Sequence, residues 1–175
     1  MSESQTSRRG FLAAGTAGLV SGLVAATPRA GAASGNVNAC GGLTRERFQD
    51  YLTLFNNNDP RFIEFYHDDV VLELTGTEIR TPRGIREFYG PVKQHLKETV
   101  SVSHFVADAT GVAVEMPTEF RCLKDWGPEN FFKRPLKVGE VMRTVSFVLY
   151  WVQDGKFRHI KSARYKQVND WRMEG

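Results

Sequence analysis

The sequence predicts an α+β domain in which a curved antiparallel sheet wraps around three N-terminal helices. Three observations predict this class. Apolar residues recur at helical spacing in much of the first half of the chain, and they alternate along most of the second half. The composition, 41% apolar and 25% charged, is that of an ordinary globular protein. A length of 175 residues suits one domain with a substantial core, here expected at 43–168.

The N-terminus has the features of an export signal. Arg8 and Arg9 stand in the pattern Ser-Arg-Arg-x-Phe-Leu, followed by a Gly/Ala/Leu/Val run and the small-residue triplet 30–32. This resembles a twin-arginine signal peptide, 1–32, which implies a folded periplasmic or secreted protein with no stable membrane anchor after cleavage. The alternatives are a chance arginine pair or a retained anchor, although the apolar run is short and rich in Gly and Ala for a span.

The charge argues against a nucleic-acid partner. The chain carries a net charge of +3, and cleavage after residue 32 would lower Lys+Arg from 23 to 20 and Asp+Glu from 20 to 19. The mature protein would then carry a net charge of about +1, and it shows no basic stripe interleaved with aromatic residues. We therefore expect no nucleic-acid binding.

The two cysteines and four histidines fit no metal-ligand spacing, so we expect no metal and no cofactor. Cys40 lies in a small-residue linker, 33–42, and Cys122 ends a predicted strand. In an exported protein these two could form a disulfide, or they could remain independent thiols.

The helical part of the domain is marked by capping residues. Thr44 precedes a run of helically spaced apolar residues, Asp59 precedes Pro60, and Thr81 precedes a third run that Gly90-Pro91 should bend. The predicted elements are helices at about 43–55, 59–66 and 81–100, and a short strand at 70–74.

The remaining strands are predicted at about 100–107, 111–122, 140–152 and 156–166, before a C-terminal tail at 169–175. Asp154-Gly155 is a strong hairpin signal. The strand 140–152 is apolar on both faces, which suits burial on one side against a partner subunit, so we expect a homodimer or homotrimer. The long loop 122–140 carries large aromatic residues, as a lid or an oligomer contact would.

This order of elements resembles the SnoaL-like branch of the nuclear transport factor two-like superfamily over residues 43–168. The supporting motifs are Asn-x-x-Asp at 56–59, Asp-Asp at 68–69, Gly-x-Arg-Glu-Phe-Tyr at 84–89 and Asp-Gly-Lys at 154–156. The branch includes polyketide cyclases, ketosteroid isomerase, scytalone dehydratase and limonene epoxide hydrolase. The resemblance implies a cone-shaped half-barrel with an apolar pocket between sheet and helices, and it identifies a fold without a reaction.

Only some of the catalytic residues known in this branch have counterparts at the matching positions of this sequence. Tyr51 falls where ketosteroid isomerase-like proteins have a helix tyrosine, but Leu74 and the region of Ser146 replace their two acids. The three charged positions of limonene epoxide hydrolase-like proteins fall at Met116, Thr118 and about Ser162.

His104 is the expected proton carrier. It shares strand parity with Val102 and Val106, so its imidazole should point toward the interior. Scytalone dehydratase-like proteins have a histidine in this strand, with an acidic partner that falls at Asn56 here. An asparagine can orient an imidazole but supplies no charge. The alternative is a core histidine held by the backbone or by Tyr51.

Strand parity places further residues near the pocket. Tyr150 and Arg164 should point inward, and Arg164 would hold a carboxylate, phenolate or enolate or else form a salt bridge at the rim. Glu119 should point outward unless Pro117 bulges its strand and turns the carboxylate inward. The predicted catalytic residues are His104 and Tyr51, and the predicted ligand contacts are Asn56, Tyr150, Arg164, Met116, Thr118, Glu119 and Trp126.

The predicted function is a cofactor-independent acid–base enzyme of the lyase, dehydratase, isomerase or cyclase type. Its substrate would be a small aromatic or polycyclic molecule, and a lignin-derived diaryl lyase is one activity that the resemblance implies. The alternatives are a small-molecule binding or assembly module without turnover, and a structural dimer whose cone is filled by its own side chains.

Overall fold

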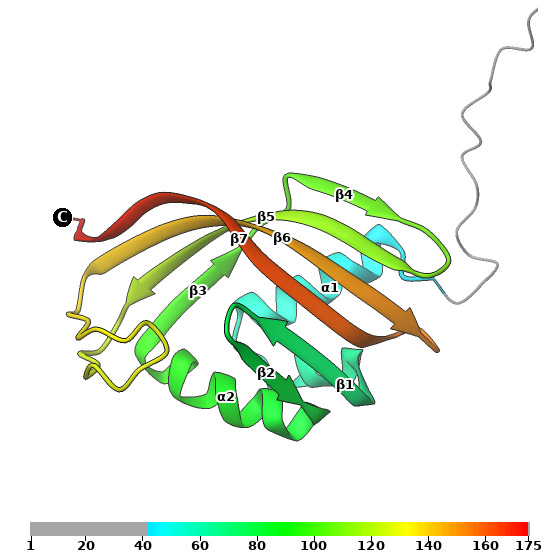
Figure 1. Cartoon of the computed structure of the whole chain (residues 1–175), viewed down its shortest axis with the longest axis horizontal. Helices are drawn as coiled ribbons and strands as arrows, with labels where there is room; N and C mark the ends of the chain where they lie inside the picture. The colour runs from blue at the N-terminus through cyan, green and yellow to red at the C-terminus, as the bar shows by residue number, and fades with distance from the viewer. Residues whose placement is uncertain (1–41, 175) are drawn as a thin grey trace, which may run out of the picture. The chain divides into compact units, whose positions relative to one another are not determined.

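The computed structural model describes residues 42–174 (Figure 1). The expected signal peptide, all but the last residue of the expected linker, and Cys40 lie outside these residues, so the predictions about them stay predictions. No helix within residues 42–174 is both long and apolar enough to cross a lipid bilayer.

The first two helices begin at the predicted caps. Helix α1 spans Arg45–Asn56, and the Thr44 side chain accepts a hydrogen bond from the Arg47 amide at 3.2 Å. A 3₁₀ helix, η2, spans Pro60–Phe65, and Asp59 caps it in the same way. The buried face of α1 is aromatic and aliphatic, and it consists of Phe48, Tyr51, Leu52 and Phe55.

The third helix is shorter than predicted. Helix α2 spans Thr81–His95, and the chain then forms strand β3, Leu96–Val100, where the sequence analysis placed helix. Leu96, Glu98 and Val100 are buried and alternate with residues that are more exposed, which is the period of a strand. The prediction of helix to residue 100 is therefore wrong, and this places Glu98 on the inner face of the sheet.

Seven strands form one curled sheet in the order β2-β1-β7-β6-β5-β3, with β4 paired to β5 (Figure 1). Besides β3, the strands are β1 Tyr66–Leu74, β2 Thr77–Arg80, β4 His104–Ala107, β5 Gly111–Cys122, β6 Glu140–Gln153 and β7 Lys156–Met173. The α+β half-barrel is confirmed.

Three details of the sheet differ from the prediction. β1 pairs with β7 in parallel, so the sheet is mixed rather than wholly antiparallel. Strand β2, which forms a hairpin with β1, was not predicted. β7 continues to Met173, through most of the segment expected as a tail, because its last residues pair with the start of β6.

The buried residues form two clusters. The larger one joins α1 and η2 to β1, β5, β6 and β7 and is rich in aromatic rings. The smaller one lies where α2 and β3 meet the far ends of β5, β6 and β7 and the loop 123–139, and it consists of Val92, Leu96, Cys122, Leu136, Met142 and Trp171. Residues of both clusters line the pocket described next.

Candidate functional site

A pocket of about 160 Å³ lies between the helices and the inner face of the sheet. An apolar protein cavity of about 150 Å³ binds benzene, so this volume suits a small ring system. The lining is mainly aromatic and aliphatic, and Glu98 and Arg164 are its two charged side chains. Within residues 42–174, no three His, Cys, Asp or Glu side chains gather as metal ligands would.

Glu98 is the unusual group in this pocket. Its side chain projects from β3, the residue is only 8% exposed, and Oε2 has no hydrogen-bond partner among the described residues. Burial raises the pKa of this carboxyl from 4.5 to about 7, against the opposing effect of the Lys93 charge. Both the acid and the carboxylate form are therefore populated near neutral pH.

Four tyrosines line the same pocket: Tyr51, Tyr66, Tyr89 and Tyr150. The Tyr51 and Tyr66 hydroxyls lie 2.9 Å apart and form a hydrogen bond in which either can be the donor. The hydroxyl that accepts this bond still has its own proton, which it can donate to a ligand. The Tyr150 hydroxyl contacts the Met116 sulfur at 3.6 Å. Within residues 42–174 the Tyr89 hydroxyl has no hydrogen-bond partner. Burial raises the pKa of all four phenols, so they are neutral donors.

Lys93 supplies the positive charge nearest to this buried acid. Its Nζ donates to the backbone oxygen of Phe55 at 2.8 Å and to Oδ1 of Asn58 at 2.9 Å. It also lies 3.8 Å from the centre of the Phe55 ring. Burial lowers the Lys93 pKa to about 8, so the ammonium is still mostly charged at neutral pH.

The inner face of the sheet adds a polar stripe to the pocket. Thr118 of β5 stands opposite Thr144 of β6, and Ser146 of β6 stands opposite Arg164 of β7. Ser162 lies on the same face of β7, and all five residues line the pocket. A ligand in the pocket would therefore meet hydroxyl groups on the sheet side and aromatic rings on the helix side.

Five of the predicted site residues line the pocket: Tyr51, Tyr150, Met116, Thr118 and Arg164. Strand parity placed the last four of these. β5 pairs with β6 without a register shift, and β6 pairs with β7 without one from Ser146–Arg164 to Trp151–His159, although bulges interrupt the ladder on both sides of that stretch. Their roles in binding or catalysis stay predictions.

The prediction that His104 points into the pocket is wrong. Its side chain is 82% exposed, and Nδ1 lies 2.7 Å from Oε2 of Glu115 on the outer face of the sheet. The chain leaves strand conformation at 101–103, so the parity restarts at His104. As a result Val106 is also exposed, and Phe105 packs against the core.

Asn56 does not line the pocket either. Its Nδ2 donates to the Val100 oxygen at 2.8 Å, and its Oδ1 accepts from the Val100 amide at 2.9 Å. The side chain therefore fastens the end of α1 to the end of β3, as a structural link.

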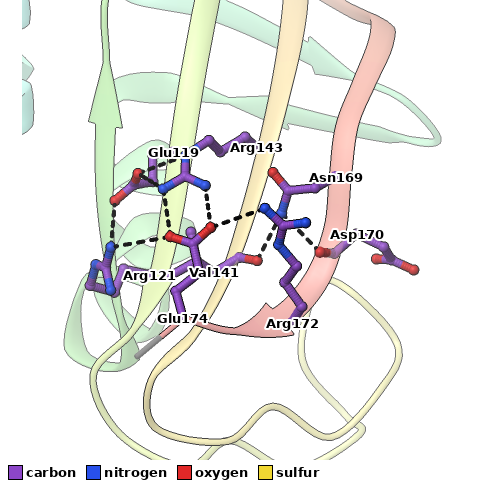
Figure 2. Close-up of polar contacts among 8 residues, drawn as sticks. All are labelled: Glu119, Arg121, Val141, Arg143, Asn169, Asp170, Arg172 and Glu174. Carbon is purple, nitrogen blue, oxygen red and sulfur yellow. Dashed lines mark hydrogen bonds and ion pairs between the residues drawn. The ribbon is translucent and has the colours of Figure 1, made fainter.

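Glu119 points outward, because Pro117 introduces no bulge and β5 stays in register with β6. Its carboxylate pairs with Arg143 at 2.7 Å, and Arg143 also pairs with Glu174 near the C-terminus (Figure 2). Arg121 completes this outer ion-pair network (Figure 2). The prediction of a pocket contact for Glu119 is wrong.

Trp126 lies outside the pocket. Its indole stacks on the His95 ring, with 4.7 Å between the ring centres. The same loop instead places Phe131 and Phe132 in the pocket lining. The loop thus covers one end of the pocket, as a lid would, but with different aromatic residues from the one predicted.

The sequence analysis missed Glu98, although a signal was present. In the run Leu-Lys-Glu-Thr-Val, Glu98 shares parity with Leu96 and Val100. This run was assigned to the preceding helix, where Glu98 would have been an ordinary surface residue. A period-two reading of residues 96–100 would have identified a carboxylate on a buried strand face, whereas Gly90-Pro91 does not end the helix, which continues to His95.

Solved structures with this fold come from several bacteria. An LEH-like epoxide hydrolase from M. tuberculosis is 16% identical, with a TM-score of 0.54, covering 67% of this chain and 78% of that one. A candidate polyketide cyclase from Pseudomonas putida KT2440 is 19% identical, with a TM-score of 0.55, covering 66% and 86%. TsrD from Streptomyces laurentii is 16% identical, with a TM-score of 0.56, covering 70% and 91%. At these identities the likeness establishes the fold alone.

No curated protein matches the sequence significantly. The family model described as a SnoaL-like domain matches residues 48–160, which is more than half of the chain and includes most of the pocket lining. The chain therefore belongs to the SnoaL-like domain family.

Proposed function

We propose that this protein is a cofactor-independent acid–base enzyme that acts on a small aromatic or polycyclic molecule. The observation that carries the proposal is Glu98, a buried carboxyl in an aromatic pocket with one oxygen that has no hydrogen-bond partner within residues 42–174. Burying such a group is costly, and proteins place groups with strongly shifted pKa values preferentially at functional sites.

The proposed reaction begins with proton abstraction by Glu98. The carboxylate removes a proton from a carbon next to a substrate carbonyl, and a tyrosine hydroxyl donates a hydrogen bond to the oxygen on which negative charge develops. Tyr89 is suited to this role because it lines the pocket and its hydroxyl has no hydrogen-bond partner in the described part of the chain, and the Tyr51–Tyr66 pair retains one proton to donate. A pKa of about 7 lets Glu98 both take and return the proton at neutral pH.

The fate of the enolate decides the reaction class. Return of the proton to another carbon gives an isomerase, attack on a second carbonyl gives a cyclase, and loss of a leaving group gives a lyase. A lyase of lignin-derived diaryl compounds is one member of the last class. The apolar lining and the family's use for small apolar ligands support this range of substrates.

A binding module without turnover is the second candidate. It is favoured by the internal contacts of the tyrosines, since Tyr51 bonds Tyr66 and Tyr150 contacts Met116 without any ligand. Such a module would hold the same apolar molecules and leave Glu98 protonated.

Deuterium exchange separates the two candidates. The full chain is incubated in heavy water with aromatic 1,3-dicarbonyl compounds and aryl ketones, and incorporation is followed by NMR. We expect exchange whose rate rises with pH around a midpoint of about 7 and falls by about a hundredfold or more in Glu98→Gln.

Matched controls are Glu115→Gln and His104→Ala, which change the ion pair on the outer face and should leave the rate unchanged. Absence of exchange in the wild type, with equal ligand binding by wild type and Glu98→Gln, would establish the binding module. Loss of exchange in His104→Ala alone would contradict the role of Glu98.

A further inference from the structure

We propose that the pocket selects amphipathic anions: ring systems that carry a carboxylate or another anionic oxygen group, held by Arg164 together with Ser146 and Ser162. The proposal deepens the function proposed above, because it names the substrate class of the same pocket. It rests on the proposed function in one respect, because it treats the bound molecule as a substrate.

Arg164 lies at an exposed part of the pocket wall. It belongs to β7, lines the pocket and is itself exposed. Glu98 lines the same pocket but is buried, and it lies on β3, three strands away in the sheet. A ligand entering the pocket would therefore pass its charged end along Arg164 and place its apolar body among the tyrosines.

The guanidinium of Arg164 has almost no contact with polar groups of the described residues. Within residues 42–174 it forms no ion pair, and its one side-chain hydrogen bond, to Oε1 of Gln167, is 3.4 Å long. Arg143, on the opposite face of the sheet, is paired with both Glu119 and Glu174. A guanidinium at a pocket with no carboxylate partner can offer its paired donors to a ligand anion.

Two hydroxyls stand where they could complete such a site. Ser146 is the direct cross-strand neighbour of Arg164, and Ser162 lies two residues before Arg164 on the same face of β7. Neither hydroxyl makes a hydrogen bond in the described part of the chain. Because a carboxylate has more acceptor sites than one guanidinium fills, both hydroxyls could donate to it.

Glu98 does not neutralise Arg164. No ion pair joins them in the described residues, and the charge that acts on Glu98 is that of Lys93. The buried acid is also flanked by neutral phenols, those of Tyr51, Tyr89 and Tyr150, so it gains no other counter-charge. Among the described residues, the pocket therefore has an exposed positive group, Arg164, without an ion-pair partner.

The test compares two probes of the same shape, 2-naphthoate and 2-naphthamide, by isothermal titration calorimetry with the full chain at pH 7 and low salt. We expect the wild type to bind the carboxylate at least about tenfold more tightly than the amide, because its hydrogen bonds to Arg164 are charge-assisted. In Arg164→Gln the preference should vanish while affinity for the amide stays unchanged, which also shows that the variant is folded.

The matched control is Arg86→Gln, an exposed arginine on α2 that does not line the pocket and should keep the preference. Equal affinity for the two probes in the wild type, a preference that survives in Arg164→Gln, or binding of neither probe would overturn the proposal. Ser146→Ala and Ser162→Ala should each lower the affinity for 2-naphthoate and leave the affinity for 2-naphthamide unchanged. If the wild type prefers 2-naphthoate but catalyses no deuterium exchange, the proposed enzyme activity is refuted and the proposed selectivity for anions is supported.

Discussion

At the residue scale, Glu98 is the most informative side chain of the protein. A carboxyl with a pKa raised from 4.5 to about 7 costs the folded state about 3 kcal/mol once it is ionised. Replacing it by a neutral or apolar group would remove this cost, so its presence at the pocket wall is better explained by chemistry than by stability.

This cost predicts a pH-dependent effect of Glu98→Gln on stability. Folded Glu98 keeps its proton at pH values where unfolded Glu98 has lost it, so wild-type stability should fall as pH rises from about 4.5 through about 7. Urea unfolding should show similar stabilities for wild type and variant at pH 5. At pH 8 the variant should have gained up to about 3 kcal/mol relative to wild type. A constant difference between pH 5 and pH 8 would contradict the raised pKa.

The residue scale also shows why some side-chain positions could be predicted and others not. Parity assigned Met116, Thr118 and Arg164 to the pocket because each lies in the same uninterrupted stretch of strand as the apolar residues with which it was compared, and the nearest bulge in β7 comes after Arg164. It failed for His104, because three residues outside the strand conformation reset the alternation. A local pattern cannot reveal where such a break occurs, since the break depends on how β3 and β4 both pair with β5.

At the scale of elements, the junction between α1 and β3 holds the site together. The Asn56 amide bonds both backbone groups of Val100, and Lys97 donates to the Asn56 backbone oxygen. Lys93 of α2 donates to the Phe55 oxygen at the same helix end, so two lysines bind the last carbonyls of α1. β3 therefore carries Glu98 on a strand that is fixed at its end.

Asn56→Ala should loosen this junction. The change removes two hydrogen bonds to partly buried backbone groups, which should cost about 1–3 kcal/mol in urea unfolding. Hydrogen exchange at the Val100 amide should also speed up. Asn57→Ala is the matched control, because that exposed side chain makes no hydrogen bond among the described residues. Equal losses in the two variants would argue against a specific link.

At the scale of the whole molecule, the sheet has an outer face with exposed apolar side chains. Phe147 is 49% exposed, Leu149 44%, Trp151 40% and Tyr165 55%, and the Phe147 and Tyr165 rings stack at 4.5 Å. These residues lie opposite the inner face that carries Ser146, Val148 and Tyr150. Apolar groups gathered on one sheet face are typical of a surface that another subunit covers.

We therefore expect the protein to form a homodimer or homotrimer through this outer face. Phe147→Asp should shift it to monomer in sedimentation velocity at micromolar concentration, because a charge would be buried at the interface. Pocket binding should persist in the monomer. Val138→Asp, a change at another exposed apolar residue in the loop 123–139, should leave the assembly intact. A wild type that sediments as a monomer would rule this interface out.

The class of fold, the caps of α1 and η2, the span of β5 and the inward-facing residues of the long strands could all be predicted from the sequence. These features depend on local spacing and on short side-chain-to-backbone contacts, which neighbouring residues decide. The family resemblance added the expectation of a pocket, and the structure has one between helices and sheet.

Which polar groups meet in that pocket depends on contacts between distant segments of the chain. Glu98 became a buried acid because its strand pairs with β5 and contacts α1, and Arg164 forms no ion pair with any residue in 42–174. Exposure and pairing are properties of contacts between segments distant in sequence, so a pattern read along one segment could not supply them.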